Sequence, residues 1–182
     1  VGYEFIKWTT TDGKEFAASG ILRSDITIIP VFEILRTTTI EQLVALAGAG
    51  AEKILIDADI VVDRPIFIVD KTTVYSEKNV KLVRDPSYAG DFFVVGIDEN
   101  EVPSVLLNKT AVLTLISENG TLTIDGNRDN MAVTVVGSSV FVTDSGTVNI
   151  HDGTVIANNA KDGNERAFIC TRYVGEWLAQ RA

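Results

Sequence analysis

Two similar stretches, GTLTIDG at residues 120–126 and GTVNIHDG at residues 146–153, begin 26 residues apart. Both alternate branched apolar residues with polar ones and end in Asp-Gly, the pattern of a short strand followed by a corner. In a weaker upstream copy, SEKNVKLV at residues 76–83, Leu82 superimposes on Ile124 at a spacing of 42 residues. That spacing is one 26-residue repeat plus an insertion of 16 residues, and residues 96–110, polar at both ends, fit the insertion as a projecting loop.

The repeat predicts a solenoid, because no single turn of such a chain can bury its own apolar residues whereas stacked turns can. The run of strand-forming segments over residues 53–159 contains no second helical pattern, which excludes a doubly wound α/β sheet. We therefore expect an all-β fold, a right-handed parallel β-helix over residues 53–182. Asn127 and the Asn158-Asn159 pair are expected to turn corners and hydrogen-bond between successive turns. The alternative is an antiparallel sandwich with a type I′ hairpin turn at Asn119-Gly120.

The first 35 residues predict a small β-hairpin appendage. Tyr3, Phe5 and Trp8 lead into a turn at Thr11-Asp12-Gly13, and residues 26–32 read as another strand. Pro30 within that strand indicates an edge or a bulge. We expect the three aromatic residues to form the core of this small unit, with stacking on a sugar as the alternative.

A linker with a capping helix is expected at residues 36–52. Apolar residues recur at helical spacing over residues 40–48, and Gln42 follows Thr39 at the distance of a capping box. Gly48 and Gly50 favour termination. The helix could cover the open end of the solenoid.

Composition and charge argue against several classes of partner and of site. The chain has 182 residues, 46% of them hydrophobic, and a net charge of -9, so it repels phosphate backbones and we expect no nucleic-acid partner. A single cysteine, Cys170, excludes an internal disulfide, and a single histidine excludes a His/Cys metal cluster. No apolar stretch approaches the ~20 residues of a transmembrane helix, so no membrane insertion is expected.

Residues 1–35 resemble the second half of the internalin-type B repeat, also called the Listeria-Bacteroides repeat, a β-grasp-like module of bacterial surface proteins. The matching residues are Gly2-Tyr3, Phe5, Trp8, Asp12-Gly13, Phe16, Asp25-Ile26-Thr27 and Val31-Phe32. The first strand and short helix of that family are absent here, and Pro30-Val31-Phe32 replaces a closing segment that ends in Trp.

Residues 37–160 resemble the start of a pectate-lyase-like β-helix of bacterial adhesin-like proteins. The resemblance lies in the Thr-capped helix, in Asp57-Ala58-Asp59-Ile60 followed by Pro65-Ile66, and in TLTIDGN at residues 121–127. Together the two resemblances imply an extracellular location on the bacterial cell surface and a role in adhesion or display, with a glycan or a surface protein as partner. Residues 168–182 depart from both patterns and could be a terminal cap or a non-native end.

An enzyme is the alternative, because β-helices also carry polysaccharide lyases and glycoside hydrolases, which use paired carboxylates. Asp57 and Asp59, two apart on an expected strand, would share a face, and Asp125 could pair with Asp129. Asp125 and Asp152, 27 residues apart, are expected to lie almost stacked. The favoured interpretation is a corner-turning Asp in each turn of the chain, where a calcium ion could bind adventitiously.

We therefore expect a non-catalytic module without a cofactor or a dedicated metal, in which His151 and Cys170 are unrelated rather than a catalytic pair. Candidate binding residues are Asp98, Glu99 and Asn100 in the insertion, together with Asp125 and Asp152. Loops on rigid scaffolds carry specific contacts. A third hypothesis is a structural spacer of a larger surface protein.

Overall fold

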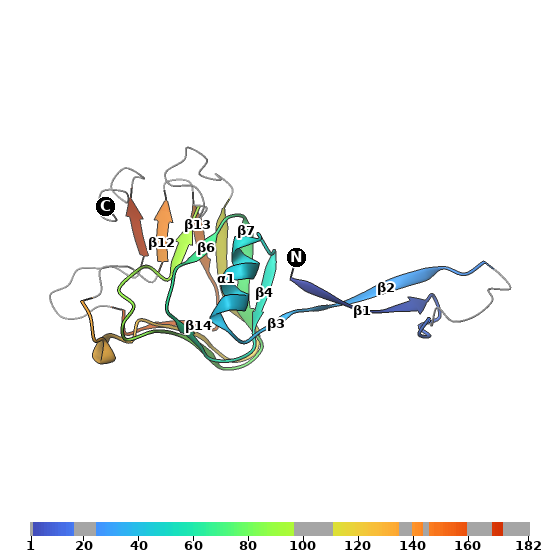
Figure 1. The fold of residues 1–182 in the computed structure, drawn as a ribbon, viewed down its shortest axis with the longest axis horizontal. Helices are drawn as coiled ribbons and strands as arrows, with labels where there is room; N and C mark the ends of the chain where they lie inside the picture. Colours follow the sequence, from blue (N-terminus) through green and yellow to red (C-terminus); the bar gives the residue numbers. More distant parts are fainter. Residues whose placement is uncertain are drawn as a thin grey trace.

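The computed structural model describes residues 2–16, 25–96, 111–134, 140–143, 146–159 and 169–172. These residues form a two-stranded ribbon joined to a body of three parallel sheets (Figure 1). The protein is mostly β, as the alternating sequence predicts.

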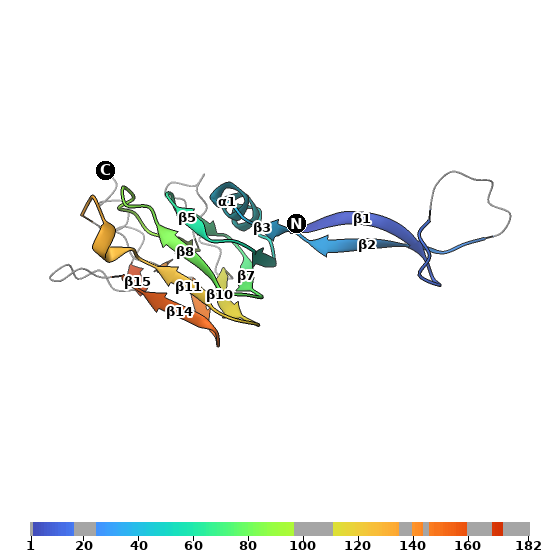
Figure 2. The ribbon, with the colours of Figure 1, turned by 90° about the horizontal axis from the view of Figure 1, so that it is seen from below.

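The ribbon pairs β1 (Tyr3–Thr10) antiparallel with β2 (Ile28–Ile34). The predicted turn follows β1, where the N–H of Gly13 donates to the carbonyl of Thr10 at 2.8 Å. Pro30 lies in β2, a strand with one partner, as a residue without an N–H requires. Figure 2 shows the ribbon extending away from the body, with the N-terminus at its root.

From β4 onward, successive strands of the body fall into three sheets in rotation, while β3 pairs with β4 in the first sheet. The first has the order β13-β10-β7-β4-β3, the second β14-β11-β8-β5 and the third β15-β12-β9-β6. We call three consecutive strands, one from each sheet, a circuit. The strands are β3 (Arg36–Thr37), β4 (Lys53–Ile56), β5 (Ile60–Val62), β6 (Ile66–Ile68), β7 (Lys71–Ser76), β8 (Val80–Arg84), β9 (Phe93–Val95), β10 (Val112–Ser117), β11 (Leu122–Asp125), β12 (Val140–Thr143), β13 (Thr147–Ile150), β14 (Thr154–Ala157) and β15 (Ile169–Arg172).

All strand pairings described in the body are parallel. The antiparallel sandwich is therefore wrong, and Asn119-Gly120 joins β10 to β11, which belong to different sheets. Apolar side chains stack in columns across the circuits: Val74, Leu115 and Ile150 form one, and Leu82 is opposite Ile124 in another. Val74, Leu115, Leu82 and Ile124 are fully buried. Each circuit thus covers the apolar side chains of the circuit before it.

The sequence repeats predict two strand registers. The structure confirms one of them and contradicts the other. Leu82 pairs with Ile124, which confirms the predicted offset of 42 residues. GTLTIDG and GTVNIHDG, however, do not stack: Leu122 pairs with Thr154, whereas Val148 pairs with Leu113. The two stretches look alike because all three sheets use short strands of branched residues after a corner, so similarity does not identify the sheet.

Corner length explains the unequal spacing. The corner from the second sheet to the third takes residues 63–65 in the first circuit, 85–92 in the second and 126–139 in the third. The first corner, between the first and second sheets, takes three or four residues in every circuit, at 57–59, 77–79, 118–121 and 151–153. The corner from the third sheet back to the first takes residues 69–70 and 144–146 in two cases but residues 96–111 in the third. A two-residue or three-residue corner therefore becomes one of sixteen residues, which confirms an insertion at the predicted place.

The predicted helix is α1 (Ile40–Gly48). The Thr39 hydroxyl accepts from the Gln42 N–H at 3.3 Å, while the Gln42 side chain accepts from the N–H of Thr38 at 2.8 Å rather than from that of Thr39. Ile40, Leu43 and Ala47 are buried against the first circuit, mainly β6. The helix therefore covers one end of the apolar core, as expected (Figure 1).

A short 3₁₀ helix, η1 (Arg128–Asn130), follows β11. The predicted corner role of asparagine is confirmed beside it. The Asn127 side-chain amide donates to the carbonyl of Arg84 at 2.8 Å, and that of Asn158 to the carboxylate of Asp125 at 3.0 Å. Each bond joins consecutive circuits.

Candidate functional site

The candidate pair Asp125 and Asp152 is not stacked. Asp125 ends β11 and lies opposite Ala157, whereas Asp152 precedes β14 and its carbonyl accepts from the N–H of Ser117 at 3.1 Å. The two aspartates thus lie near opposite ends of the second sheet. The expected stacking is wrong because it followed from the 26-residue register, which assigned the two strands to one sheet.

Asp125 has a structural partner on each side. Its Oδ1 accepts from the N–H of Asn127 at 2.8 Å and from the amide of Asn158 at 3.0 Å. This is the corner-turning role that Asp before Gly predicts. Asp129, the other proposed partner of Asp125, instead pairs with Arg128 at 3.1 Å.

Asp57 and Asp59 lie in a corner and not on a strand, so the expectation of a shared strand face is wrong. The Asp57 carboxylate pairs with Lys78 at 3.0 Å and with Arg36 at 3.3 Å. The hydrogen bond from Lys78, helped by Arg36, lowers the pKa of Asp57 below its ordinary value. Asp59 accepts from the N–H of Lys81, in the next circuit, at 2.7 Å. Both aspartates tie the first circuit to its neighbour.

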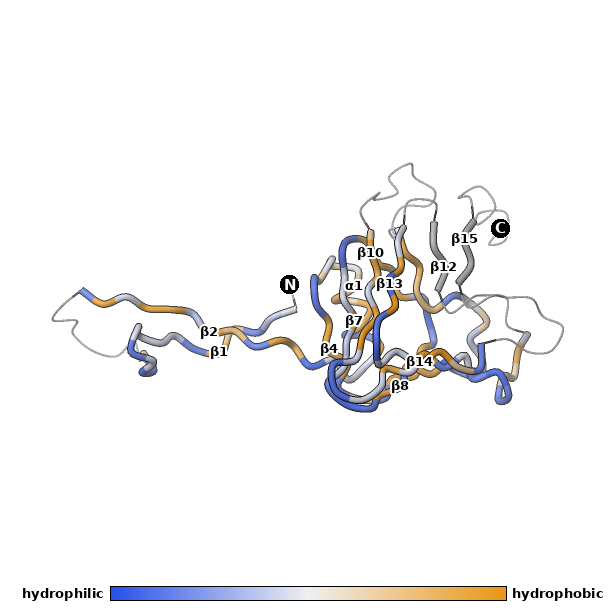
Figure 3. Tube along the Cα trace, turned by 180° about the vertical axis from the view of Figure 1, so that it is seen from behind, coloured by the Kyte–Doolittle hydropathy of each residue, from blue (hydrophilic) through white to orange (hydrophobic). Residues whose placement is uncertain are grey.

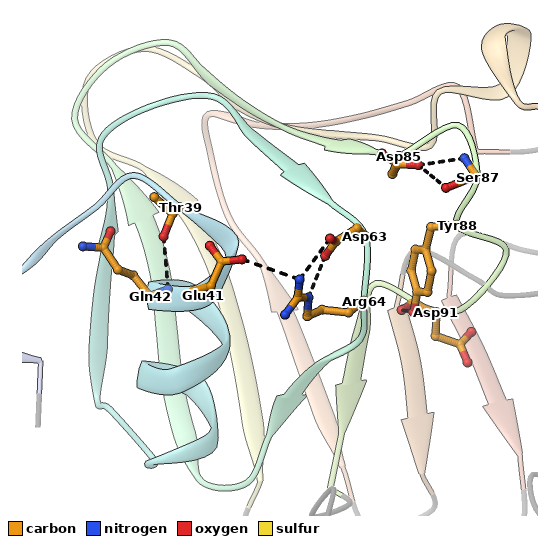
Figure 4. A network of polar contacts seen from close by, with 9 residues as sticks. All are labelled: Thr39, Glu41, Gln42, Asp63, Arg64, Asp85, Ser87, Tyr88 and Asp91. Carbon is orange, nitrogen blue, oxygen red and sulfur yellow. Dashed lines mark hydrogen bonds and ion pairs between the residues drawn. The ribbon is translucent and has the colours of Figure 1, made fainter.

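An acidic corner lies where the second sheet turns toward the third (Figure 4). Arg64 binds both oxygens of Asp63, at 2.7 and 3.0 Å, and reaches Glu41 of α1 at 3.5 Å. One circuit later, the Asp85 carboxylate accepts from the N–H of Ser87 at 2.8 Å. Arg64 lowers the pKa of Asp63, and the Ser87 hydrogen bonds lower that of Asp85. The corner therefore fastens the capping helix to the first circuit.

Arg84 stabilises the corner between β8 and β9 from its buried side. Its side chain is buried, and its guanidinium lies 4.5 Å from the centre of the Phe92 ring and donates to the carbonyl of Gly90. Burial lowers the pKa of Arg84. The Tyr88 hydroxyl donates to the carbonyl of Asp91 at 2.6 Å (Figure 4). These contacts fix the shape of the longer corner between β8 and β9.

Asp57, Asp63 and Asp85 do not have the properties of a general acid, which needs a raised pKa to hold its proton at neutral pH. The pKa is lowered at Asp57, Asp63 and Asp85. They are therefore ionised at neutral pH and suited to structural ion pairs. Within the described ranges, no group of three or more His, Cys, Asp or Glu side chains could hold a metal ion.

The insertion has two fixed ends. Its first residue, Gly96, has φ of +99° and donates its N–H to the carbonyl of Ile68 in the preceding circuit at 2.9 Å. Ala111, which directly follows the predicted insertion, is fully buried, and its carbonyl accepts from the N–H of Thr147 in the following circuit at 3.0 Å. The candidate residues Asp98, Glu99 and Asn100 lie outside the described residues. The anchors were not predicted, although a glycine directly after a buried strand was a usable signal.

The ribbon carries the other unusual surface of the protein. Tyr3, Phe5 and Trp8 are 46%, 45% and 42% exposed, so the prediction that they form a small core is wrong. A ribbon of two strands offers no second layer that could cover them. Phe5 contacts Trp8 and Phe32, with ring centres 5.4 and 5.9 Å apart.

Comparisons with protein-family models, curated proteins and solved structures give no match to this chain. The resemblances to an internalin-type repeat and to a pectate-lyase-like β-helix therefore stay predictions. Among the residues that the structure describes, no helix has the length and apolar character needed to cross a membrane.

Proposed function

We propose that the body is a right-handed parallel β-helix and that the protein is a non-catalytic module of a bacterial cell surface, which binds an extracellular glycan or protein through its insertion. Rotation of the chain through three parallel sheets supports the β-helix. Stacked circuits give a rigid scaffold, and specific contacts concentrate on loops held by such scaffolds.

One observation carries the assignment of the binding segment. The corner that takes two residues at 69–70 takes sixteen at 96–111, and both of its ends are hydrogen-bonded to neighbouring circuits. Connections of this length in compact domains are usually functional. Asp98, Glu99 and Asn100 are the residues proposed for contact, because an acidic and amide-bearing segment can bind sugar hydroxyls or basic protein surfaces.

Deletion of residues 97–110 tests the proposal sharply. It leaves Gly96-Ala111, a corner of the same length as Val69-Asp70, so the circuits should still stack. The wild-type protein, the deletion variant and Lys81→Ala, a control on the exposed outer face of the second sheet, are screened on arrays of glycans and surface proteins. Wild type and Lys81→Ala should bind the same partner, and the deletion variant should not. Equal binding by the deletion variant would overturn the proposal.

The enzymatic alternative is tested on the same samples. Polygalacturonate and a panel of acidic glycans are incubated with the wild-type protein, and unsaturated or reducing ends are measured. No product is expected. Product formation that disappears in Asp125→Asn would contradict the non-catalytic assignment.

A further inference from the structure

The two strands of the ribbon turn one apolar face to solvent. Residues directly opposite in an antiparallel pair share a face, and the opposite pairs are Tyr3 with Ile34, Phe5 with Phe32, Trp8 with Pro30, and Thr10 with Ile28. All of these side chains except that of Thr10 are apolar. We call this set the ribbon face.

A bulge creates this face. The register shifts between Phe5 and Lys7, so Ile6 is an extra residue in β1. Without the shift, Trp8 would point to the side opposite Phe5, since side chains alternate along a strand. With it, the Trp8 and Phe5 rings lie 5.4 Å apart.

Charged residues of the ribbon strands lie on the other side. Glu4 is opposite Glu33, and Lys7 is opposite Val31, in the alternate positions of both strands. Within β1 and β2 the ribbon face therefore carries no charge that association would have to desolvate, and the charged residue beside it is Lys14, whose carbonyl accepts from the N–H of Thr10 at 2.8 Å after the turn. Figure 3 shows the apolar stretch along β2 on the ribbon, away from the core of the body.

We infer that the ribbon face is an interface on which a second copy of this chain docks, ribbon against ribbon. The inference goes beyond the proposed function, which uses the insertion on the body. A two-stranded sheet is marginal in water, and a second ribbon supplies the missing apolar layer. A two-fold arrangement places each ribbon face on an identical one, so apolar surface meets apolar surface throughout.

The area is sufficient for a specific dimer. A buried aromatic side chain removes 150–250 Å² from water, and Tyr3, Phe5, Trp8 and Phe32 are 42–55% exposed. With the flanking Ile28, Pro30 and Ile34, face-to-face contact would bury on the order of 1,000 Å² in total, the lower bound for a specific interface. Dissociation constants of about 1–100 µM match an interface of that size.

The test measures the mass of the full chain by sedimentation over a range of concentrations. The wild type should pass from monomer to dimer. The variant Phe5→Thr/Trp8→Thr/Phe32→Thr should raise the dissociation constant about a hundredfold or more, since aromatic anchors dominate such interfaces. Threonine favours strands and so keeps the ribbon. The matched control, Ile29→Thr/Val31→Thr on the other side, should dimerise as wild type does.

Tryptophan fluorescence gives a second readout. In a Trp177→Phe chain, Trp8 is the sole tryptophan, and its emission should shift to the blue as the dimer forms. Four outcomes would overturn the inference: a wild type that stays monomeric, an aromatic triple variant that still dimerises, a dimer with unchanged Trp8 emission, or a monomer whose Trp8 emission shifts only when a glycan or another protein is added.

Discussion

The Asn127 side-chain amide donates a 2.8 Å hydrogen bond to the main-chain carbonyl of Arg84, one circuit earlier. Asn127 holds this position with φ of +54°, in the left-handed region. Asn158, in the following circuit, has φ of +52°, and its amide donates to the side-chain carboxylate of Asp125, also one circuit earlier. Asparagine serves here because it tolerates this backbone and carries an amide that spans the distance between strands.

Asn127→Ala should lower the free energy of unfolding by about 2–3 kcal/mol, because it loses the bond to Arg84 and places Ala in the left-handed region. Asn127→Gly should lose only about 1 kcal/mol, since Gly accepts the backbone but supplies no amide. Urea denaturation measures both. Equal losses in the two variants would contradict the role of the φ angle.

Substitution of Gly153 and of Gly48 by Ala can be compared, because an added Cβ meets different surroundings at the two positions. A Cβ at Gly153, where φ is +77°, would lie 2.6 Å from the carbonyl oxygen of Ser117, whereas a Cβ at Gly48 would meet nothing within 4 Å. Gly153→Ala should cost more than about 2 kcal/mol, through backbone strain and separation of two circuits. Gly48→Ala should be neutral or stabilise by about 0.5–1 kcal/mol, because it ends α1. Thermal unfolding distinguishes the pair, and similar effects would contradict the close approach at Gly153.

Asp57 should make stability depend on pH. Its pKa in the folded state lies below the ordinary value of 3.8, chiefly through Lys78, so its contribution is present above that value and disappears as pH falls through the lower folded pKa. Asp57→Asn should therefore lower stability at neutral pH but not in strong acid. Urea midpoints from about pH 7 to pH 2 measure this difference. In a Lys78→Met chain the effect of Asp57→Asn at neutral pH should shrink, and an unchanged effect would contradict the assignment.

Deletion of residues 97–110 should leave stability equal or raise it by about 1–2 kcal/mol, because a shorter loop costs less entropy to close. The anchors at Gly96 and Ala111 stay in place. Circular dichroism and urea denaturation measure the result. Loss of the folded state would show that the insertion is part of the core, in which case loss of binding would say nothing about contact.

Local features could be predicted from the sequence. The Thr39 cap and the helix after it depend on residues within a few positions, and the asparagine corners depend on side chains that suit a left-handed backbone. The offset between Leu82 and Ile124 was also predicted, because the two strands have similar sequences and occupy the same sheet. In each case the residues that carry the sequence pattern are the residues that make the contact in the structure.

The assignment of each strand to one of the three sheets could not be predicted from the sequence. Strands of all three sheets need the same branched residues, so GTVNIHDG resembled a strand of another sheet, and the stacking of Asp125 on Asp152 failed with it. The exposure of Trp8 was missed because the bulge at Ile6, which moves Trp8 to the face of Phe5, has no sequence signal comparable to glycine or proline. Of the candidate site, the position of the insertion was predicted and its anchors were not.

A disulfide tests the stacking of circuits most directly. The Ser76 hydroxyl lies 2.8 Å from that of Ser117, across the parallel pair of β7 and β10. In a Cys170→Ser chain, Ser76→Cys/Ser117→Cys should form an intramolecular disulfide under mild oxidation, detected by mass spectrometry as the loss of two hydrogens and of both reactive thiols. Two thiols that stay free and accessible to alkylation after oxidation would contradict the stacked, parallel arrangement of the circuits.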